Sequence, residues 1–323
     1  MKSKKILSLT SFILGATLLS ACTGMYNPVT FNDNWKTNPE ANSPINETLV
    51  YNVSYSKNDG LIEAYEINYT NGEYVANLST VNEDGKTYYL YQTELSIDVI
   101  YEYGSATKQF TDTVSSEIKF ARAADRLRPV YSTKTLNSHS PSNGAVENID
   151  DCYYAHSYTV ETTYNANLTE GKTVITEHTA EGDKKSDPKT FEIDEEDTRY
   201  LDNEQLIFAL RGVNPTSFPT ANFLVYAPFT KAVQQVKATF PTSAEGATFK
   251  FHRNGTQIEQ NINYRSVKLA LNTNNPGAEQ TIWIAEKSEN NVNRNVILKM
   301  ETPLSYGIGS LVYTLTSETY SES

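Results

Sequence analysis

Residues 74–103 read YVANLSTVNEDGKTYYLYQTELSIDVIYEY, two strand-like runs joined by a tight-turn dipeptide. The runs 74–81 and 87–103 are rich in Tyr, Thr, Val and Ile, the aromatic and β-branched residues that favour pleated sheets. Asp84-Gly85 separates them, and a two-residue hairpin turn needs positive φ at both central positions, which suits this pair. The stretch therefore predicts an antiparallel β-hairpin.

The same pattern extends outward in both directions. Residues 48–55 alternate, with Leu49, Tyr51 and Val53 on one face, as expected of a half-buried strand. Asn71-Gly72 and Asn254-Gly255 predict two more hairpin turns. Further strand-like runs occupy residues 110–120, 130–136, 153–165, 172–179, 190–193, 233–240, 247–252, 257–265, 267–271, 280–287, 295–301 and 309–316. We therefore expect a mainly β protein.

One helix is predicted, at about residues 202–211. Asp202 can cap it, with Gln205 at capping-box spacing, and Gly212 follows as a stop signal. The Pro-rich segment 214–228 is expected to be a loop that packs over apolar surface. The predicted fold class is a curved antiparallel sheet or open half-barrel with one packed α-helix.

The N-terminus predicts export and anchoring. Three lysines precede an apolar stretch over residues 6–19, which is the pattern of a signal peptide. Leu19-Ser20-Ala21-Cys22 resembles the bacterial lipobox, which implies a signal peptide over residues 1–21 and acyl chains such as palmitate on Cys22. Several chains on one residue would hold the protein stably at a membrane. We expect an extracytoplasmic protein, on the inner or the outer membrane.

The Asn- and Pro-rich residues 22–46 are interpreted as a flexible tether. Residues 47–318 are expected to form a single β domain, in which 137–200 could be an inserted segment. Removal of Lys2, Lys4 and Lys5 with the leader takes the net charge from −12 to about −15. Such a surface repels nucleic acid, so the membrane, reached through the lipid, is the expected partner. Cys152 has no disulfide partner once Cys22 is lipidated, and we expect it to be buried.

Several stretches resemble a poorly characterised bacterial envelope family with a domain of unknown function, distantly like the LolA/LolB-type lipoprotein carriers. They are residues 47–53, 112–117, 127–131, the helix at 202–211, and 281–285, 293–300 and 309–315. Asn295 stands where that family usually has Pro, and the segment 140–200 is longer. The resemblance implies a curved sheet wrapped around a helix and open at one face. It implies no catalytic residues.

The candidate ligand site is an apolar groove between the sheet and the helix. Its predicted lining is Leu206, Leu210, Phe218, Phe223 and Tyr226, and its ligand an acyl chain or other apolar group. The alternative is a surface module whose Tyr-rich strands, drawn from 22 Tyr, bind an envelope protein or a glycan.

An enzyme is the weakest of the three hypotheses. On a strand, Cys152 and His156 would lie about 13 Å apart, too far for a thiolate–imidazole pair. The four His show no zinc-ligand spacing. We therefore expect a non-catalytic binding protein without a metal or cofactor.

Overall fold

The computed structural model describes residues 29–38, 43–58, 64–194, 199–271, 279–287 and 292–322. The predicted signal peptide over residues 1–21 and the lipid-anchor residue Cys22 lie outside this part of the chain. No helix within it is long and apolar enough to cross a membrane. The strands are β1 (Ile45–Lys57), β2 (Glu66–Glu83), β3 (Lys86–Tyr103), β4 (Ala106–Ala121), β5 (Pro129–Pro141), β6 (Tyr153–Tyr164), β7 (Glu170–Thr179), β8 (Gly182–Lys185), β9 (Lys189–Glu192), β10 (Thr220–Ala227), β11 (Ala232–Thr239), β12 (Glu245–Arg253), β13 (Thr256–Leu271), β14 (Gln280–Ala285), β15 (Ile297–Pro303) and β16 (Gly309–Glu322).

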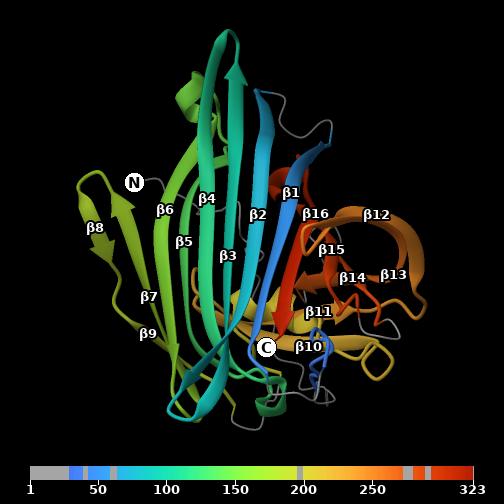
Figure 1. Ribbon diagram of the computed structural model, residues 1–323. Coiled ribbons are helices and arrows are strands. Elements are labelled where there is room, and N and C mark those ends of the chain that lie inside the picture. Colours follow the sequence, from blue (N-terminus) through green and yellow to red (C-terminus); the bar gives the residue numbers. More distant parts are fainter. Residues whose placement is uncertain are drawn as a thin grey trace.

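These strands form one barrel-like sheet, in the order β10-β11-β13-β14-β15-β16-β1-β2-β3-β4-β5-β6-β7-β8. β9 also pairs with β7, and β12 pairs with β13 and briefly, in parallel, with β16. The long strands β1–β6 stand as one tall wall, and β10 and β11 run across its lower part (Figure 1). The described residues of the suspected insertion, 137–200, supply β6–β9 and the end of β5 to the same sheet. The predicted mainly β class with one packed helix is confirmed.

Two of the three predicted hairpin turns are confirmed, and one is wrong. Asp84-Gly85 joins β2 to β3 with φ of 49° and 74°, and Asn254-Gly255 joins β12 to β13. At Asn71-Gly72 the chain does not reverse: β2 continues through it, with a bulge in its pairing to β3. A Cβ on Gly72 would lie 2.5 Å from the carbonyl oxygen of Val53 in β1, so Gly is needed there for close backbone approach.

The predicted helix is present but short, because its first turn is a 3₁₀ helix. This turn, η3 (Asn203–Gln205), leads into α1 (Leu206–Leu210). The capping box forms as expected: the Glu204 N–H donates to Asp202 Oδ1 over 2.8 Å, and the Asp202 N–H donates to Gln205 Oε1 over 3.3 Å. The remaining 3₁₀ helices are η1 (Ala123–Asp125), η2 (Ile149–Asp151) and η4 (Ser305–Gly307).

Two predicted irregular segments are more ordered than expected. The segment 214–228 is a loop only as far as residue 219, after which β10 begins at Thr220. The tether predicted over residues 22–46 is wrong for residues 29–38, because Val29 and Trp35 are buried and Phe31 bridges to Val213. A scarcity of aliphatic residues indicates a tether, but the aromatic rings of Phe31 and Trp35 pack this segment against the barrel. β1 then starts at Ile45.

α1 fills the interior of the barrel near this segment. Phe208 is fully buried, with ring centroids 4.8 Å from Trp35, 5.4 Å from Tyr91 and 5.3 Å from Phe120. Gly212 follows the helix where a Cβ would lie 2.7 Å from the Trp35 ring. The helix is therefore part of one continuous aromatic core rather than the wall of a wide groove.

Candidate functional site

The sequence-predicted ligand residues do not converge on one cavity. Leu206 and Phe223 are buried in the main core, where Phe223 stacks on Phe31 at 6.3 Å. Phe218 is half-buried and packs against the same core. Leu210 and Tyr226 do line pockets, but two different ones. That these five residues bind a ligand therefore stays a prediction. The pocket lined by Leu210 is the one beside the helix, where the groove is predicted.

This helix-end pocket lies between the end of α1 and strands β13 and β14. It has a volume of about 260 Å³. Its floor is apolar and buried, made of Leu210, Val213, Phe240, Val267, Ile284 and Ala285. Its rim is mostly polar, made of Asn34, Asn214, Thr216, Arg265, Glu286, Lys287 and Asn295 together with Pro215. An apolar floor with a few polar groups around it is the usual composition of a small-molecule site.

Arg265 gives the rim a hydrogen-bond donor that is held in place. Its guanidinium donates to the carbonyl oxygen of Pro241 over 2.6 Å and forms an ion pair with Glu286 at 2.7 Å. Its Nε is buried and has no partner among the residues that the structure describes. Because a buried donor without a partner is costly, an oxygen-bearing ligand that reached Nε would gain a hydrogen bond there.

A buried ion-pair network holds the side of the pocket formed by the helix end. Arg211 directly follows α1, and its Nη1 lies 2.5 Å from Glu47 Oε2 in β1. Arg294 Nη1 lies 2.6 Å from the other oxygen of Glu47, and Arg294 also pairs with Glu318 in β16. The rim residue Asn295 donates through Nδ2 to the carbonyl oxygen of Arg211 over 2.7 Å. The rim at Asn295 is thereby fixed to the helix end.

The pKa of Glu47 reflects the positive charge that Arg211 and Arg294 place beside its carboxylate. Burial alone would raise the pKa of this carboxyl, but the charges and hydrogen bonds of Arg211 and Arg294 outweigh burial and lower it to about 2. The carboxylate is therefore charged at any physiological pH. Sequence reasoning missed this network, because its members come from β1, the helix end, the β14–β15 connection and β16, with no shared motif.

Cys152, the candidate nucleophile of the enzyme hypothesis, lies buried in the core. Cys152 is buried as predicted, and burial raises the pKa of its thiol, which keeps the thiol protonated. Its Sγ lies 3.8 Å from the carbonyl oxygen of Asn148, which lets the thiol act as a weak donor. Within the described residues, no three His, Cys, Asp or Glu side chains are grouped so that they could hold a metal ion.

Comparison with known proteins identifies the fold but no activity. No family model matches the sequence, and no curated protein matches it. The structure is similar to the crystal structure of a beta-barrel-like protein of a domain of unknown function, DUF1849, from Brucella abortus. The similarity has a TM-score of 0.51 and covers 86% of this chain and 98% of that chain, at 9% sequence identity. At this identity it shows the fold alone, a barrel-like sheet that fits an uncharacterised family of unknown function.

Proposed function

We propose that this protein is a non-catalytic binding protein of the bacterial envelope, anchored through lipid on Cys22, whose helix-end pocket holds the apolar part of a small ligand. The observation that carries the proposal is the buried apolar floor around Leu210, which opens to a rim where Arg265 Nε has no partner among the described residues. The resemblance to LolA/LolB-type carriers supports the same function.

The size of the pocket limits what it can hold. A volume of about 260 Å³ equals roughly nine water molecules at ~30 Å³ each. This suits a short apolar segment or the end of an acyl chain better than a complete lipid tail. A ligand oxygen near Arg265 would face the rim while the apolar part covers Val267 and Ile284.

A neutral amphiphile tests this site. We expect 1-octanol, titrated into the full chain, to shift the methyl NMR signals of Val213, Val267 and Ile284. Thr216→Trp places a large side chain on the exposed rim and should weaken this binding about fivefold or more, since it displaces the ligand from its apolar floor. Thr248→Trp, on an exposed position of β12, is the matched control and should bind octanol as the unchanged protein does.

Octanol binding that Thr216→Trp leaves intact would contradict the proposed site. Mass spectrometry of protein purified without detergent is a second readout, and we expect a co-purifying amphiphile that Thr216→Trp loses.

The anchor is tested separately. Expressed in a bacterium, the unchanged protein should appear in the membrane fraction and incorporate labelled palmitate, whereas Cys22→Ala should do neither. Palmitate incorporation by Cys22→Ala would show that the anchor is elsewhere.

The alternative, a Tyr-rich interaction surface, receives less support. Its aromatic patch should be exposed, yet the exposed large apolar residues of the described chain are Tyr154 in β6, Val233 in β11 and Val292 between β14 and β15. Rings such as Tyr51 and Tyr101 point into the core instead.

A further inference from the structure

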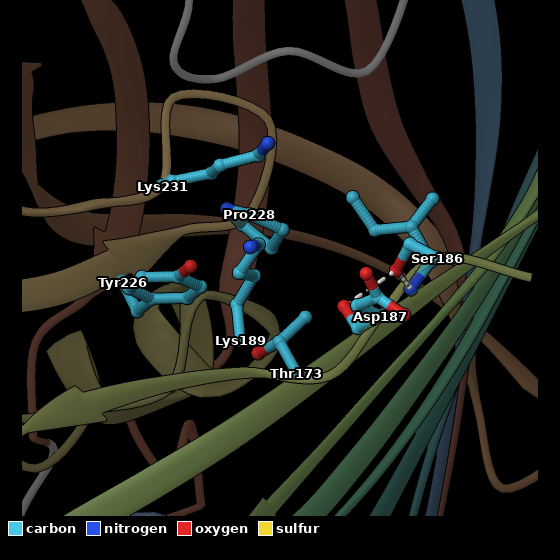
Figure 2. Close-up of a pocket in the computed structure, with 8 residues that line it drawn as sticks. Thr173, Ser186, Asp187, Lys189, Tyr226, Pro228 and Lys231 are labelled. Carbon is cyan, nitrogen blue, oxygen red and sulfur yellow. Dashed lines mark hydrogen bonds between the residues drawn. The ribbon is translucent and has the colours of Figure 1, made fainter.

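The two ends of the sheet meet at a seam, and a second pocket opens beside it. At the seam the rings of Phe191 in β9 and Tyr226 in β10 stack with centroids 3.9 Å apart. The adjoining seam pocket has a volume of about 220 Å³. It is lined by Thr173, Ile175, Ser186, Asp187, Lys189, Tyr226, Pro228 and Lys231 (Figure 2).

A bulge in the edge strand shapes one side of the seam pocket. β8 and β9 pair with opposite ends of β7, and residues 186–188 between them face the middle of that strand. Ser186 keeps contact there: its N–H donates to the Ile175 carbonyl oxygen over 2.8 Å, and its Oγ accepts from the Ile175 N–H over 3.0 Å. Such bulges re-aim neighbouring side chains and are frequent beside functional sites. Ser186 Oγ is thus engaged with backbone, so the pocket is suited to binding rather than to nucleophilic chemistry.

Three hydrogen-bond donors line the opening. Lys189 rises from β9, Lys231 extends from the turn between β10 and β11, and the Tyr226 hydroxyl lies on the side of its ring that faces Lys189 (Figure 2). Burial raises the pKa of Tyr226, so its phenol stays protonated and can donate. Two ammonium groups and one phenol are well matched to an anionic oxygen group.

Ion pairing separates the two pocket lysines from a third lysine at the same edge of the sheet. Among the described residues, neither Lys189 nor Lys231 forms an ion pair, whereas Lys185 of the same edge lies 3.9 Å from Glu161. Asp187 lines the same pocket, so the charge of its lining is +1. In a chain of net charge −12, a pocket with a surplus of unpaired positive charge points to a ligand of negative charge.

The other lining residues of the seam pocket give it apolar surface. Tyr226, Pro228 and Ile175 give apolar surface, and Thr173 is buried at the side. The volume corresponds to roughly seven water molecules at ~30 Å³ each, which admits a small molecule only. The pocket therefore combines an anion-binding set with room for a short apolar group.

We propose that the seam pocket is a second binding site, independent of the helix-end pocket, that takes a small organic anion: a carboxylate or phosphate ester held by Lys189, Lys231 and the Tyr226 hydroxyl. The ligand is free in solution rather than a lipid headgroup, because the acidic chain is repelled by an anionic membrane surface. That repulsion does not prevent binding of a free ion in the pocket, since distant charges are screened beyond about 8 Å at physiological salt.

Calorimetric titration of the full chain with monobutyl phosphate, butyrate and inorganic phosphate tests the assignment. We expect monobutyl phosphate to bind more tightly than inorganic phosphate and more weakly as salt increases. Lys189→Gln and Lys231→Gln should each weaken its binding about threefold to tenfold, because each removes one charge-assisted contact at an exposed site. Asp187→Asn should strengthen binding, because it removes a like charge.

Lys237→Gln is the matched control, an exposed lysine on β11 outside the pocket, and should bind as the unchanged protein does. Binding that survives both pocket substitutions, or that Lys237→Gln weakens equally, would overturn the site. Inorganic phosphate bound as tightly as its butyl ester would overturn the organic part. The site would instead belong to a lipid surface if the protein sedimented with phosphatidylglycerol vesicles, lost this sedimentation with either pocket substitution, and bound neither free monobutyl phosphate nor butyrate.

Discussion

Glu47 is a buried carboxylate whose two oxygens face the guanidinium groups of Arg211 and Arg294. A lone buried charge would be expensive, so each member of this network depends on the others for its burial. The arrangement joins β1, the helix end and the β14–β15 connection at one point. The Glu47 carboxylate therefore holds these three segments together, as apolar contacts hold other segments of the core together.

Removal of this charge should be costly. Glu47→Gln leaves Arg211 and Arg294 buried without their shared carboxylate, and we expect a loss of about 3–5 kcal/mol in the free energy of unfolding. Urea unfolding at pH 7 measures it. Glu66→Gln, which removes an exposed ion pair with Lys57, is the control and should cost at most about 1 kcal/mol. Equal losses in the two variants would show that the network contributes no more than a surface pair.

The same residue predicts a pH dependence. The pKa of Glu47 lies at about 2 in the folded chain and near 4.5 in an ordinary environment. Because the folded pKa is the lower one, its stabilisation is complete above pH 4.5 and is lost as the pH falls towards 2. Unfolding midpoints between pH 6 and pH 3 should therefore fall more for the unchanged protein than for Glu47→Gln, in which this carboxyl is absent. Parallel pH profiles would contradict the assignment.

Single residues were predicted from sequence where a local rule applies. Asp202 and Gln205 form the expected capping box because both partners lie within one turn. Cys152 is buried, as a lone apolar thiol in a β protein tends to be. Glu47 and Arg211 could not be paired in advance, since 164 residues separate them and each is an ordinary surface residue by type.

At the scale of elements, the two dipeptides Asp84-Gly85 and Asn71-Gly72 show where turn chemistry decides and where it does not. Both have a residue with positive φ, yet only the first reverses the chain. β3 is unbroken over 18 residues and pairs with β2 on both sides of Asn71-Gly72, so the long partner strand imposes a bulge. Local dihedral preference cannot reveal the length of the neighbouring strand.

This difference gives a paired prediction. Gly72→Ala would place a methyl 2.5 Å from the Val53 carbonyl oxygen, so β1 and β2 must separate, and we expect a cost of about 2–3 kcal/mol. Gly85→Ala meets nothing within 4 Å and is strained only by its φ of 74°, which should cost about 1 kcal/mol. Denaturant unfolding of both variants measures the difference. A larger loss for Gly85→Ala would mean that the bulge tolerates a side chain.

The strand pattern of the sequence predicts a curved sheet, but it does not predict how the two ends of that sheet meet in the molecule. The pattern predicts a curved sheet or open half-barrel, and in the structure side chains from both ends of the sheet, Phe191 and Tyr226, narrow the open face. In the described chain, a single parallel bridge, Tyr200 to Leu224, links the β9 side to β10. The Phe191 ring stacks on the Tyr226 ring and occupies the space that a side chain at Gly171 would need. No periodicity in any one strand reports on contacts made between the two ends of the sheet.

In the described chain the seam is held by stacked rings and one bridge, whereas the other strands are joined by longer hydrogen-bonded ladders, so the barrel should open most easily at the seam. Phe191→Ala removes the ring stacked on Tyr226, so amide hydrogen exchange should accelerate in β9 and β10 while β2–β4, paired on both sides, keep their protection. Exchange measured by mass spectrometry under native conditions resolves the two regions. Phe249→Ala, which removes a half-buried ring on β12 away from the seam, is the control and should leave β9 and β10 unchanged. Uniform acceleration through β2–β4 in Phe191→Ala would instead mean that the sheet opens as one unit, with the seam no weaker than its ladders.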